Sequence, residues 1–276
     1  MTDLSKLKKG ISIGFFGGLS KEAFQSCKKN NIGCVEISSS YNDYIEKYNY
    51  LSKAAEYSKM AADAGVEIWS LHLPFGRELD ISSLDEKIRE FTINTNKDLI
   101  SAAASAGIKM VVMHPSAEPI SEQERPLQFE FSKKNILLIS KFCQSLSVTL
   151  AVENLPRTCL CNTGAETVKL LSDTGAVLCF DTNHSLIESN GDFLRKIISG
   201  GIKIGTLHIS DYDFIDERHR VPGDGVVNWK EVCNLLEEAD YNGPLMYEIS
   251  RQTKDREPVT DEQLVENQRQ LALKLI

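Results

Sequence analysis

The stretch LDEKIREFTINTNKDLISAAASAGIKMVVMHP, residues 84–115, contains the unit from which the rest of the chain is built. Its first part has apolar residues at helical spacing and ends at Gly107, a residue type that favours the left-handed turn after a helix. A short apolar run follows, and His114 stands where that run ends. The stretch therefore predicts a helix over 84–106, a strand over 108–114 and a polar side chain at the strand's C-terminal end.

The same alternation recurs along the chain. Strands are expected at 11–16, 33–38, 66–73, 108–114, 148–154, 176–181, 203–209 and 244–249. Helices are expected at 19–30, 49–64, 84–106, 129–146, 163–173, 191–199, 228–239 and 260–275. Several of these helices lead into a glycine, in NNIG, DAG, SAG, DTG and YNG. Eight such units predict an α/β fold, a (β/α)8 TIM barrel, as a single domain over residues 1–276.

An open doubly wound sheet is the alternative that fits the same alternation. That fold expects a glycine-rich phosphate turn after its first strand, and GFFGGLS (14–20) does not match GxGxxG. Nearly continuous apolar runs such as VVM and LAV also suit strands that are buried on both faces. The barrel is therefore the preferred fold.

Composition narrows the class of protein. The chain has 276 residues, is 42% hydrophobic and 25% charged, and carries a net charge of −8, which describes an ordinary globular protein and disfavours a general nucleic-acid binder. The N-terminal MTDLSKLKKG lacks an apolar signal segment, and no apolar run approaches the ~20 residues of a membrane span. Seven scattered cysteines without CxxC pairs predict reduced thiols in a cytoplasmic protein. Cys159 and Cys161 are either a C-x-C metal pair or two loop residues.

Histidines and carboxylates gather at the predicted strand ends. All five histidines lie at or just past the end of an apolar run, and Glu153, Asp181 and Glu248 occupy equivalent places. Strands five to eight each deliver one ligand, and neighbouring strands lie ~4.8 Å apart. We therefore expect one divalent ion (Mn, Zn, Co or Mg) to be bound by Glu153, Asp181, His208 and Glu248.

This site chemistry predicts an enzyme. A divalent ion could hold two adjacent oxygens of a sugar and stabilise the charge of an enediolate. Glu153 and Glu248 would remove and return a proton at the carbon next to the carbonyl. The expected function is a metal-dependent sugar or sugar phosphate isomerase or epimerase of carbohydrate metabolism, with a small carbohydrate as its partner.

The motifs HLP (72–74), HP (114–115), EN (153–154), DTNH (181–184), HISD (208–211) and H-x-x-PGDG (219–225) occur in this order before the late Glu248. With them the whole chain resembles the xylose-isomerase-like TIM-barrel superfamily, which holds sugar phosphate isomerases and epimerases and the apurinic endonuclease family 2. Similarity to its ketose 3-epimerases implies that Glu153, Asp181, His208 and Glu248 bind one Mn-type ion and that the two glutamates move the proton. It also implies that His184 contacts the substrate.

The endonuclease branch of the superfamily provides the alternative, a zinc-dependent apurinic/apyrimidinic endonuclease-like phosphodiesterase with up to three ions and abasic DNA as its partner. The resemblance implies zinc ligands at His72, His114, Glu153, Asp181, His184, His208, Glu217, His219 and Glu248, and Glu217 stands where that branch has aspartate. Against this alternative, the chain is acidic, and the loops after the first three strands lack a basic and aromatic mixture. Tyr41, Tyr44 and Tyr48 could stack on bases, line a sugar pocket or pack locally.

Several assignments complete the predicted site. Arg218 or Arg220 could hold a substrate phosphate or hydroxyl, and PGDG (222–225) is either an anion nest or a tight turn. A barrel that only binds a ligand is a third hypothesis, and the complete acid and metal-binding set argues against it. Nothing in the sequence names an interface, although a homo-oligomer would suit this type of barrel. The residues expected to contact substrate are His72, His114, His184, Glu217 and His219.

Overall fold

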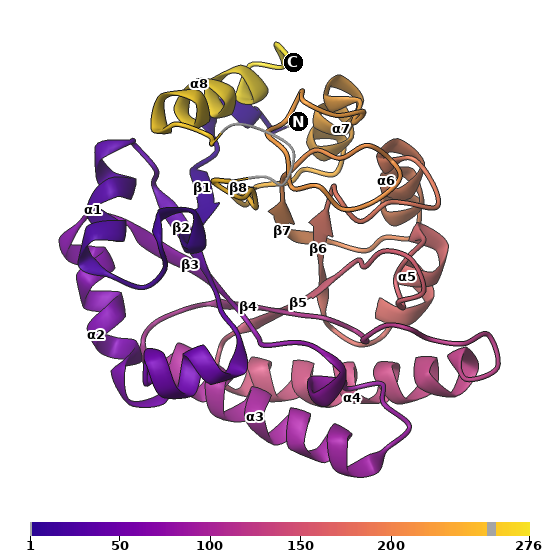
Figure 1. The fold of residues 1–276 in the computed structure, drawn as a ribbon. Helices are drawn as coiled ribbons and strands as arrows, with labels where there is room; N and C mark the ends of the chain where they lie inside the picture. The colour runs from indigo at the N-terminus through magenta and orange to yellow at the C-terminus, as the bar shows by residue number, and fades with distance from the viewer. Residues whose placement is uncertain (1, 253–257) are drawn as a thin grey trace.

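The computed structural model describes residues 2–252 and 258–276, and Figure 1 shows a central ring of strands surrounded by helices. The parallel strands form one sheet in the order β7-β6-β5-β4-β3-β2-β1-β8. Ile209, just past β7, forms a parallel bridge with Tyr247 of β8 and thereby joins the two ends of the sheet. This arrangement confirms the (β/α)8 TIM barrel. The strands are β1 (Lys9–Ser12), β2 (Cys34–Ser38), β3 (Glu67–His72), β4 (Met110–Met113), β5 (Thr149–Glu153), β6 (Val177–Asp181), β7 (Ile204–His208) and β8 (Leu245–Tyr247).

The helices lie outside the ring and begin at polar caps. Side chains such as Ser20, Asp85 and Thr163 accept a backbone N–H of the first helical turn, which satisfies a donor that would otherwise lack a partner. The predicted helices agree with the observed ones within a few residues. They are α1 (Lys21–Lys29), α2 (Tyr50–Asp63), α3 (Glu86–Ser105), α4 (Arg125–Ser145), α5 (Gly164–Leu171), α6 (Asn190–Ser199), α7 (Trp229–Glu238) and α8 (Asp261–Ala272).

The first predicted strand, 11–16, is wrong over its second half. The strand ends at Ser12, and Ile13–Phe16 forms a short 3-10 helix. That helix ends at Gly17, whose φ of 93° places it in the left-handed region. Ile13 and Phe15 are buried in this turn, so the apolar run reflects burial in a helix and not a longer strand.

The predicted glycine stops are only partly correct. Gly65 and Gly107 have φ values of 74° and 85°, as expected for the residue after a helix. After α1 and α7, however, the left-handed positions are Asn31 and Asp240, at 55° and 50°. Asn and Asp tolerate this conformation, so the glycines of NNIG and YNG are not needed for it.

Apolar side chains fill the space around and inside the barrel. The main core lies between the sheet and the helices, and Val112, Ala151 and Cys179 form a smaller separate cluster. Nε1 of Trp69 on β3 donates to Oγ1 of Thr206 on β7 across 3.2 Å, which ties together strands from opposite sides of the ring. All seven cysteines are buried and unpaired, and the described residues contain no helix suited to crossing a membrane.

Candidate functional site

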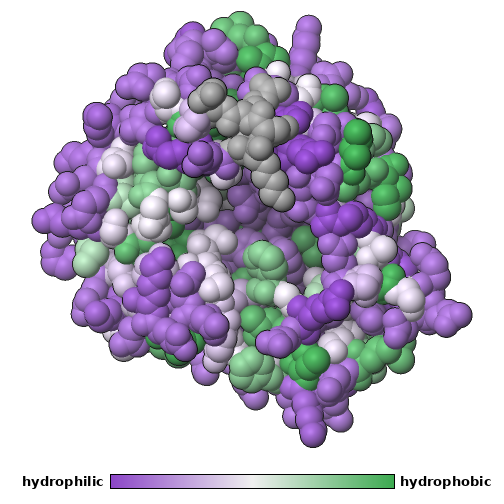
Figure 2. Space-filling model, in the orientation of Figure 1, coloured by the Kyte–Doolittle hydropathy of each residue, from purple (hydrophilic) through white to green (hydrophobic). Residues whose placement is uncertain are grey.

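The predicted site residues lie at one mouth of the barrel. The last residues of β3, β5, β6 and β7 are His72, Glu153, Asp181 and His208. His114 and Glu248 directly follow β4 and β8, so the parallel direction of the strands brings all six to the same end. Figure 2 shows a recess near the middle of the face seen in Figure 1, with hydrophilic residues at its floor.

The EN and DTNH motifs build the floor of this site. The Asn154 side chain accepts the N–H of Asp181 at 2.8 Å and donates to its carbonyl at 2.9 Å, which continues the pairing of β5 with β6 beyond the backbone ladder. Oδ1 of Asp181 accepts the N–H of Asn183 at 2.5 Å. Oδ2 of Asp181 is buried without a hydrogen-bond partner among the described residues.

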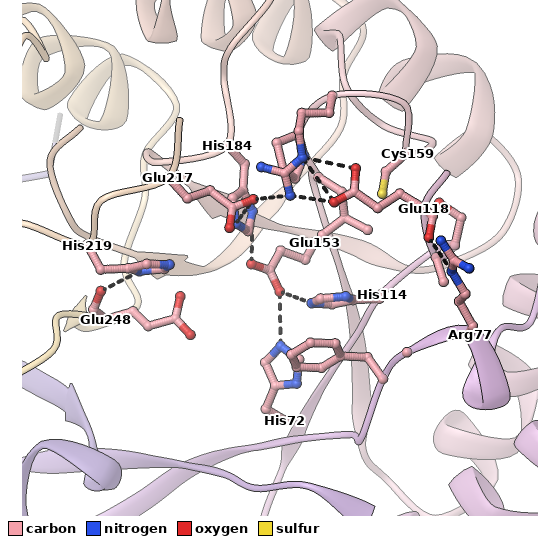
Figure 3. Close-up of a pocket in the computed structure, with 17 residues that line it drawn as sticks. His72, Arg77, His114, Glu118, Glu153, Cys159, His184, Glu217, His219 and Glu248 are labelled. Carbon is pink, nitrogen blue, oxygen red and sulfur yellow. Dashed lines mark hydrogen bonds and ion pairs between the residues drawn. The ribbon is translucent and has the colours of Figure 1, made fainter. Parts of the chain in front are cut away.

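Glu153 is at the centre of the cluster, and four imidazoles surround its carboxylate. Oε2 lies 3.0 Å from Nε2 of His72 and 3.1 Å from Nε2 of His114. Oε1 lies 3.0 Å from Nδ1 of His208 and 3.3 Å from Nδ1 of His184. Figure 3 shows the Glu153 carboxylate pointing between His72, His114 and His184.

The contacts of His72 place a proton or a metal ion between its ring and Glu153. Its Nδ1 lies 2.8 Å from the carbonyl oxygen of Leu73, and a carbonyl only accepts, so Nδ1 carries the hydrogen. In the neutral ring, Nε2 would then direct a lone pair at the Glu153 carboxylate 3.0 Å away. Two electron-rich atoms at this distance require a proton or a metal ion.

The carboxylates and imidazoles of the cluster shift one another's pKa values in opposite directions. Burial raises the pKa of Asp181 well above its usual value. Burial would also raise the pKa of Glu153, but His208 and His114 bring it well below the usual range. Burial would lower the pKa of His184, and the nearby Asp181 and Glu153 raise it to about 10. Protonated imidazoles therefore compensate the negative charge of these carboxylates. A divalent cation would compensate the same negative charge.

Four of the predicted ligands fit a divalent ion. One ligand atom from each of Glu153, Asp181, His208 and Glu248 lies within 4.8 Å of all the others. Three carboxylates and one imidazole suit a hard or borderline cation, and a bound ion would give Oδ2 of Asp181 the partner it lacks. The structure therefore brings together the four residues that were expected from the sequence to bind the ion.

Two further groups of donors lie beside the first. His72 joins Glu153 and His208 in one, and His184, Glu217 and His219 form the other. Nδ1 of His219 lies 3.1 Å from the carbonyl oxygen of Glu248, so its Nε2 is available to the cavity. Among the described residues, none of the metal-capable groups includes a cysteine, which leaves the C-x-C pair Cys159 and Cys161 as buried loop residues.

A cavity of about 300 Å³ opens above the carboxylates. Phe75 forms part of its wall, with 54% of its surface exposed and its ring stacked on His114 at a centroid distance of 4.0 Å. Glu153 and Glu248 line the cavity, whereas Asp181 and His208 do not. All five residues expected to contact substrate also line it, namely His72, His114, His184, Glu217 and His219.

The cavity contains an arginine that the sequence did not reveal. Arg157, in the loop after β5, pairs with Glu118 after β4 and with Asp216 and Glu217 after β7, the last at 2.9 Å. Ion pairs between separate loops leave no periodic signal in a sequence. Arg218, one of the two predicted phosphate-binding arginines, donates from Nε to Asp213 at 2.6 Å.

A second buried carboxylate, Glu36 on β2, was also missed. It is fully buried, and its Oε1 lies 2.8 Å from Nε2 of His208. Its signal was present as an ionisable residue inside the apolar run CVEIS.

The PGDG segment encloses a side chain of the protein itself. The buried Asp211 accepts the N–H of Gly223 at 2.8 Å, that of Val227 at 3.1 Å and Nε1 of Trp229 at 2.8 Å. A Cβ at Gly225 would lie 2.2 Å from Oδ1 of Asp211, so only glycine fits. The segment is thus a turn beside an internal carboxylate, in which the N–H of Gly223 is taken by Asp211 and that of Asp224 by the carbonyl of Val221.

Comparison with known proteins agrees with this architecture. The sequence profile of the xylose isomerase-like TIM barrel matches residues 24–270. The chain belongs to this family. The outer limits of the domain, 1–276, remain a prediction.

Proteins similar to this chain include one uncharacterized protein and two with named activities. An uncharacterized protein of Methanocaldococcus jannaschii is 27% identical over 187 residues, which are 64% of this chain and 63% of that protein. An inosose isomerase of Halalkalibacterium halodurans is 26% identical over 82% of this chain and 80% of its own length. A D-psicose 3-epimerase of Agrobacterium fabrum is 31% identical over 40% of this chain and 38% of its own length.

A solved structure shows the same fold. The crystal structure of a D-tagatose 3-epimerase-like protein has a TM-score of 0.80 and 22% sequence identity, and the match covers 98% of each chain.

Proposed function

We propose that this protein is a divalent-metal-dependent isomerase or epimerase of a sugar or sugar phosphate. The observation that carries the proposal is the meeting of ligand atoms of Glu153, Asp181, His208 and Glu248 within 4.8 Å of one another, with Glu153 and Glu248 lining the cavity. Inosose isomerase and D-psicose 3-epimerase, two relatives of this chain, bear names of the same class. A bound divalent ion would polarise adjacent oxygens of the substrate and stabilise negative charge that develops on them.

The four residues divide the work by their access to the cavity. Asp181 and His208 are fully buried and do not line it, so they are suited to holding the ion. Glu153 and Glu248 line the cavity, and both contact Nδ1 of His208, at 3.0 and 3.2 Å. They are the carboxylates that can reach a carbon of the substrate.

The protonation of these two glutamates suits a proton acceptor. Burial favours their neutral forms, yet His208 lowers the pKa of Glu153 and of Glu248 below the usual value. Each is therefore ionised near neutral pH and able to take a proton from the carbon next to a carbonyl. One ionised glutamate can remove the proton on one side of the carbon, and the other, once it has taken a proton from solvent, can deliver it to the opposite side. His184, His114, His219 and Glu217 would bind and orient the hydroxyl groups, and Phe75 offers an apolar surface.

Isotope exchange provides the test. Protein loaded with Mn²⁺ is incubated in D2O with a panel of ketoses and aldoses, with and without phosphate, and deuterium at carbon is followed by NMR. Exchange with at least one sugar is expected, and Glu153→Gln or Glu248→Gln should abolish it. Glu130→Gln, a change on the exposed face of α4, serves as the matched control. Absence of exchange across the whole panel would count against the proposal.

A zinc-dependent apurinic/apyrimidinic endonuclease-like activity is the second candidate. It is favoured by the additional donor group His184, Glu217 and His219, whose ligand atoms lie within 4.8 Å of one another. The ion pair of Arg157 with Glu217 opposes it, because the guanidinium occupies an oxygen that a cation would need.

Two of the three tyrosines after β2, Tyr44 and Tyr48, give this second candidate no support, whereas Tyr41 is partly exposed. Tyr44 and Tyr48 are buried, and the hydroxyl of Tyr44 donates to the carbonyl of His72 at 2.7 Å. Elemental analysis together with an abasic-duplex nicking assay separates the two candidates. About one ion per chain and no nicking are expected, whereas three ions with nicking would favour the endonuclease. A homo-oligomer stays a prediction.

A further inference from the structure

Glu36 lies deep in the barrel, below the proposed ion site. The residue is fully buried in the middle of β2, where the pairing register with β3 shifts between Val35 and Glu36. Its Oε2 accepts the hydroxyl of Ser70 at 2.7 Å, which fixes the carboxylate from one side. Its Oε1 faces Nε2 of His208 at 2.8 Å.

These two facing atoms depend on each other. Neither Oε1 of Glu36 nor Nε2 of His208 makes an aligned hydrogen bond to any described group, and each is the other's near neighbour. Among the described residues, Glu36 forms an ion pair with His208 alone. A buried carboxylate with one cationic neighbour is costly, and in some proteins such a group fixes the conformation of the residues around it.

The short contact with Glu36 favours one of the two nitrogens of His208 as the site of its hydrogen. An ionised carboxylate only accepts, so a hydrogen on Nε2 is stabilised by Glu36. The lone pair of the neutral ring then lies on Nδ1. That atom is 3.0 Å from Glu153 and 3.2 Å from Glu248, on the side where the ion would bind.

We infer that Glu36 is a positioning residue that holds His208 in its Nε2–H tautomer and directs Nδ1 at the divalent ion. The inference rests on the proposed function, since it concerns the same ion site. Carboxylates that accept from the second nitrogen of a metal-bound histidine fix its orientation, and their loss typically costs about 10–100-fold in metal affinity.

Three variants separate positioning from a merely structural role. Glu36→Leu removes the acceptor, Glu36→Gln keeps a side-chain carbonyl that can accept from Nε2, and Ser70→Ala is the control for the other carboxylate oxygen. Mn²⁺ and Zn²⁺ dissociation constants are measured by chelator competition. Glu36→Leu should weaken binding about 10–100-fold, and Glu36→Gln should restore most of the loss. The thermal midpoint of the metal-free Glu36→Leu protein should fall, because one partner of a buried pair has been removed, so the dissociation constants are measured well below that midpoint.

The tautomer itself can be read without any variant. In wild-type protein loaded with diamagnetic Zn²⁺, long-range nitrogen–proton NMR should show the His208 hydrogen on Nε2. A hydrogen on Nδ1 would overturn the inference. Unchanged metal affinity in Glu36→Leu would also overturn it. If that variant does not fold, the inference would be overturned by a loss of metal affinity in Glu36→Gln as large as the loss caused by removing a metal ligand. Wild-type protein that binds neither ion would instead refute the proposed function, so the two failures are distinguishable.

Discussion

Nδ1 of His208 lies 3.0 Å from Oε1 of Glu153, a contact that joins the end of β7 to the end of β5. Burial alone would lower the pKa of His208, but Cys179 and the carboxylates Glu248, Glu36 and Glu153 around it keep that pKa well above the usual value. His208 therefore carries an extra proton near neutral pH when no ion is bound. Nδ1 has to lose that proton before it can coordinate a metal.

Ion binding should consequently release protons. We expect the apparent Mn²⁺ affinity to rise as pH increases from about 6 to about 8, because protonated His208 competes with the ion and falling proton concentration favours the ion. Calorimetric titration in two buffers of different ionisation enthalpy measures the number of protons released. A binding heat that is the same in both buffers would contradict the assignment of His208 as a ligand.

Arg157 should control the capacity of the second donor group. Its guanidinium lies 2.9 Å from Oε1 of Glu217, so Glu217 is engaged before any ion arrives. Arg157→Met frees this oxygen next to His184 and His219, and we expect the zinc content at saturation to rise by about one ion per chain. Elemental analysis after dialysis measures it, with Arg195→Met as the control, because Arg195 pairs with Asp192 and Glu231 on the outer helices. An unchanged zinc content would show that His184, Glu217 and His219 do not hold an ion.

The fold could be predicted because its signals are local. Each strand is a short apolar run and each helix has its own periodicity, so the pattern within 84–115 already contains the repeating unit. The error at 11–16 has the same origin, since a buried 3-10 turn such as Ile13–Phe16 is also a short apolar run. Composition could not distinguish the two, because the difference lies in the left-handed Gly17 that follows.

The site could be predicted as far as topology dictates it. Parallel strands place their last residues at one mouth, which is why Glu153, Asp181 and His208 meet without any sequence proximity. Contacts between side chains that face each other across the barrel could not be predicted, because the sequence does not show which side chains face each other. Glu36 faces His208 from strand β2, and Arg157 reaches loops on both sides, and neither pairing follows from spacing along the chain.

The cysteines should be unreactive in the folded protein. Burial raises the pKa of Cys27, Cys34, Cys143 and Cys159 to about 12, so almost none of each is thiolate at pH 8. Iodoacetamide at that pH should leave the native protein unmodified by mass spectrometry, and all seven cysteines should react after denaturation in guanidinium. Rapid native labelling of Cys159, which lines the cavity, would show that the cavity opens more than the structure indicates.

Asp211 should stabilise the loop that carries Glu217 and His219. Its buried carboxylate accepts the backbone N–H of Gly223 and Nε1 of Trp229, both at 2.8 Å. In Asp211→Asn, one of the two carboxylate oxygens becomes an NH2 group. This group cannot accept a hydrogen bond, so the N–H groups that donated to that oxygen lose their acceptor. We expect the free energy of unfolding to fall by about 1–3 kcal/mol.

Urea unfolding followed by tryptophan fluorescence measures this change, because Trp229 itself reports on the loop. The matched control is Asp63→Asn, whose carboxylate is 66% exposed and pairs with Lys59 within one helix, so its midpoint should hardly move. The same loop places Glu217 and His219 at the cavity, and KM for a reactive sugar should therefore rise in Asp211→Asn more than kcat falls. Equal urea midpoints for Asp211→Asn and Asp63→Asn would mean that the loop does not depend on its internal carboxylate.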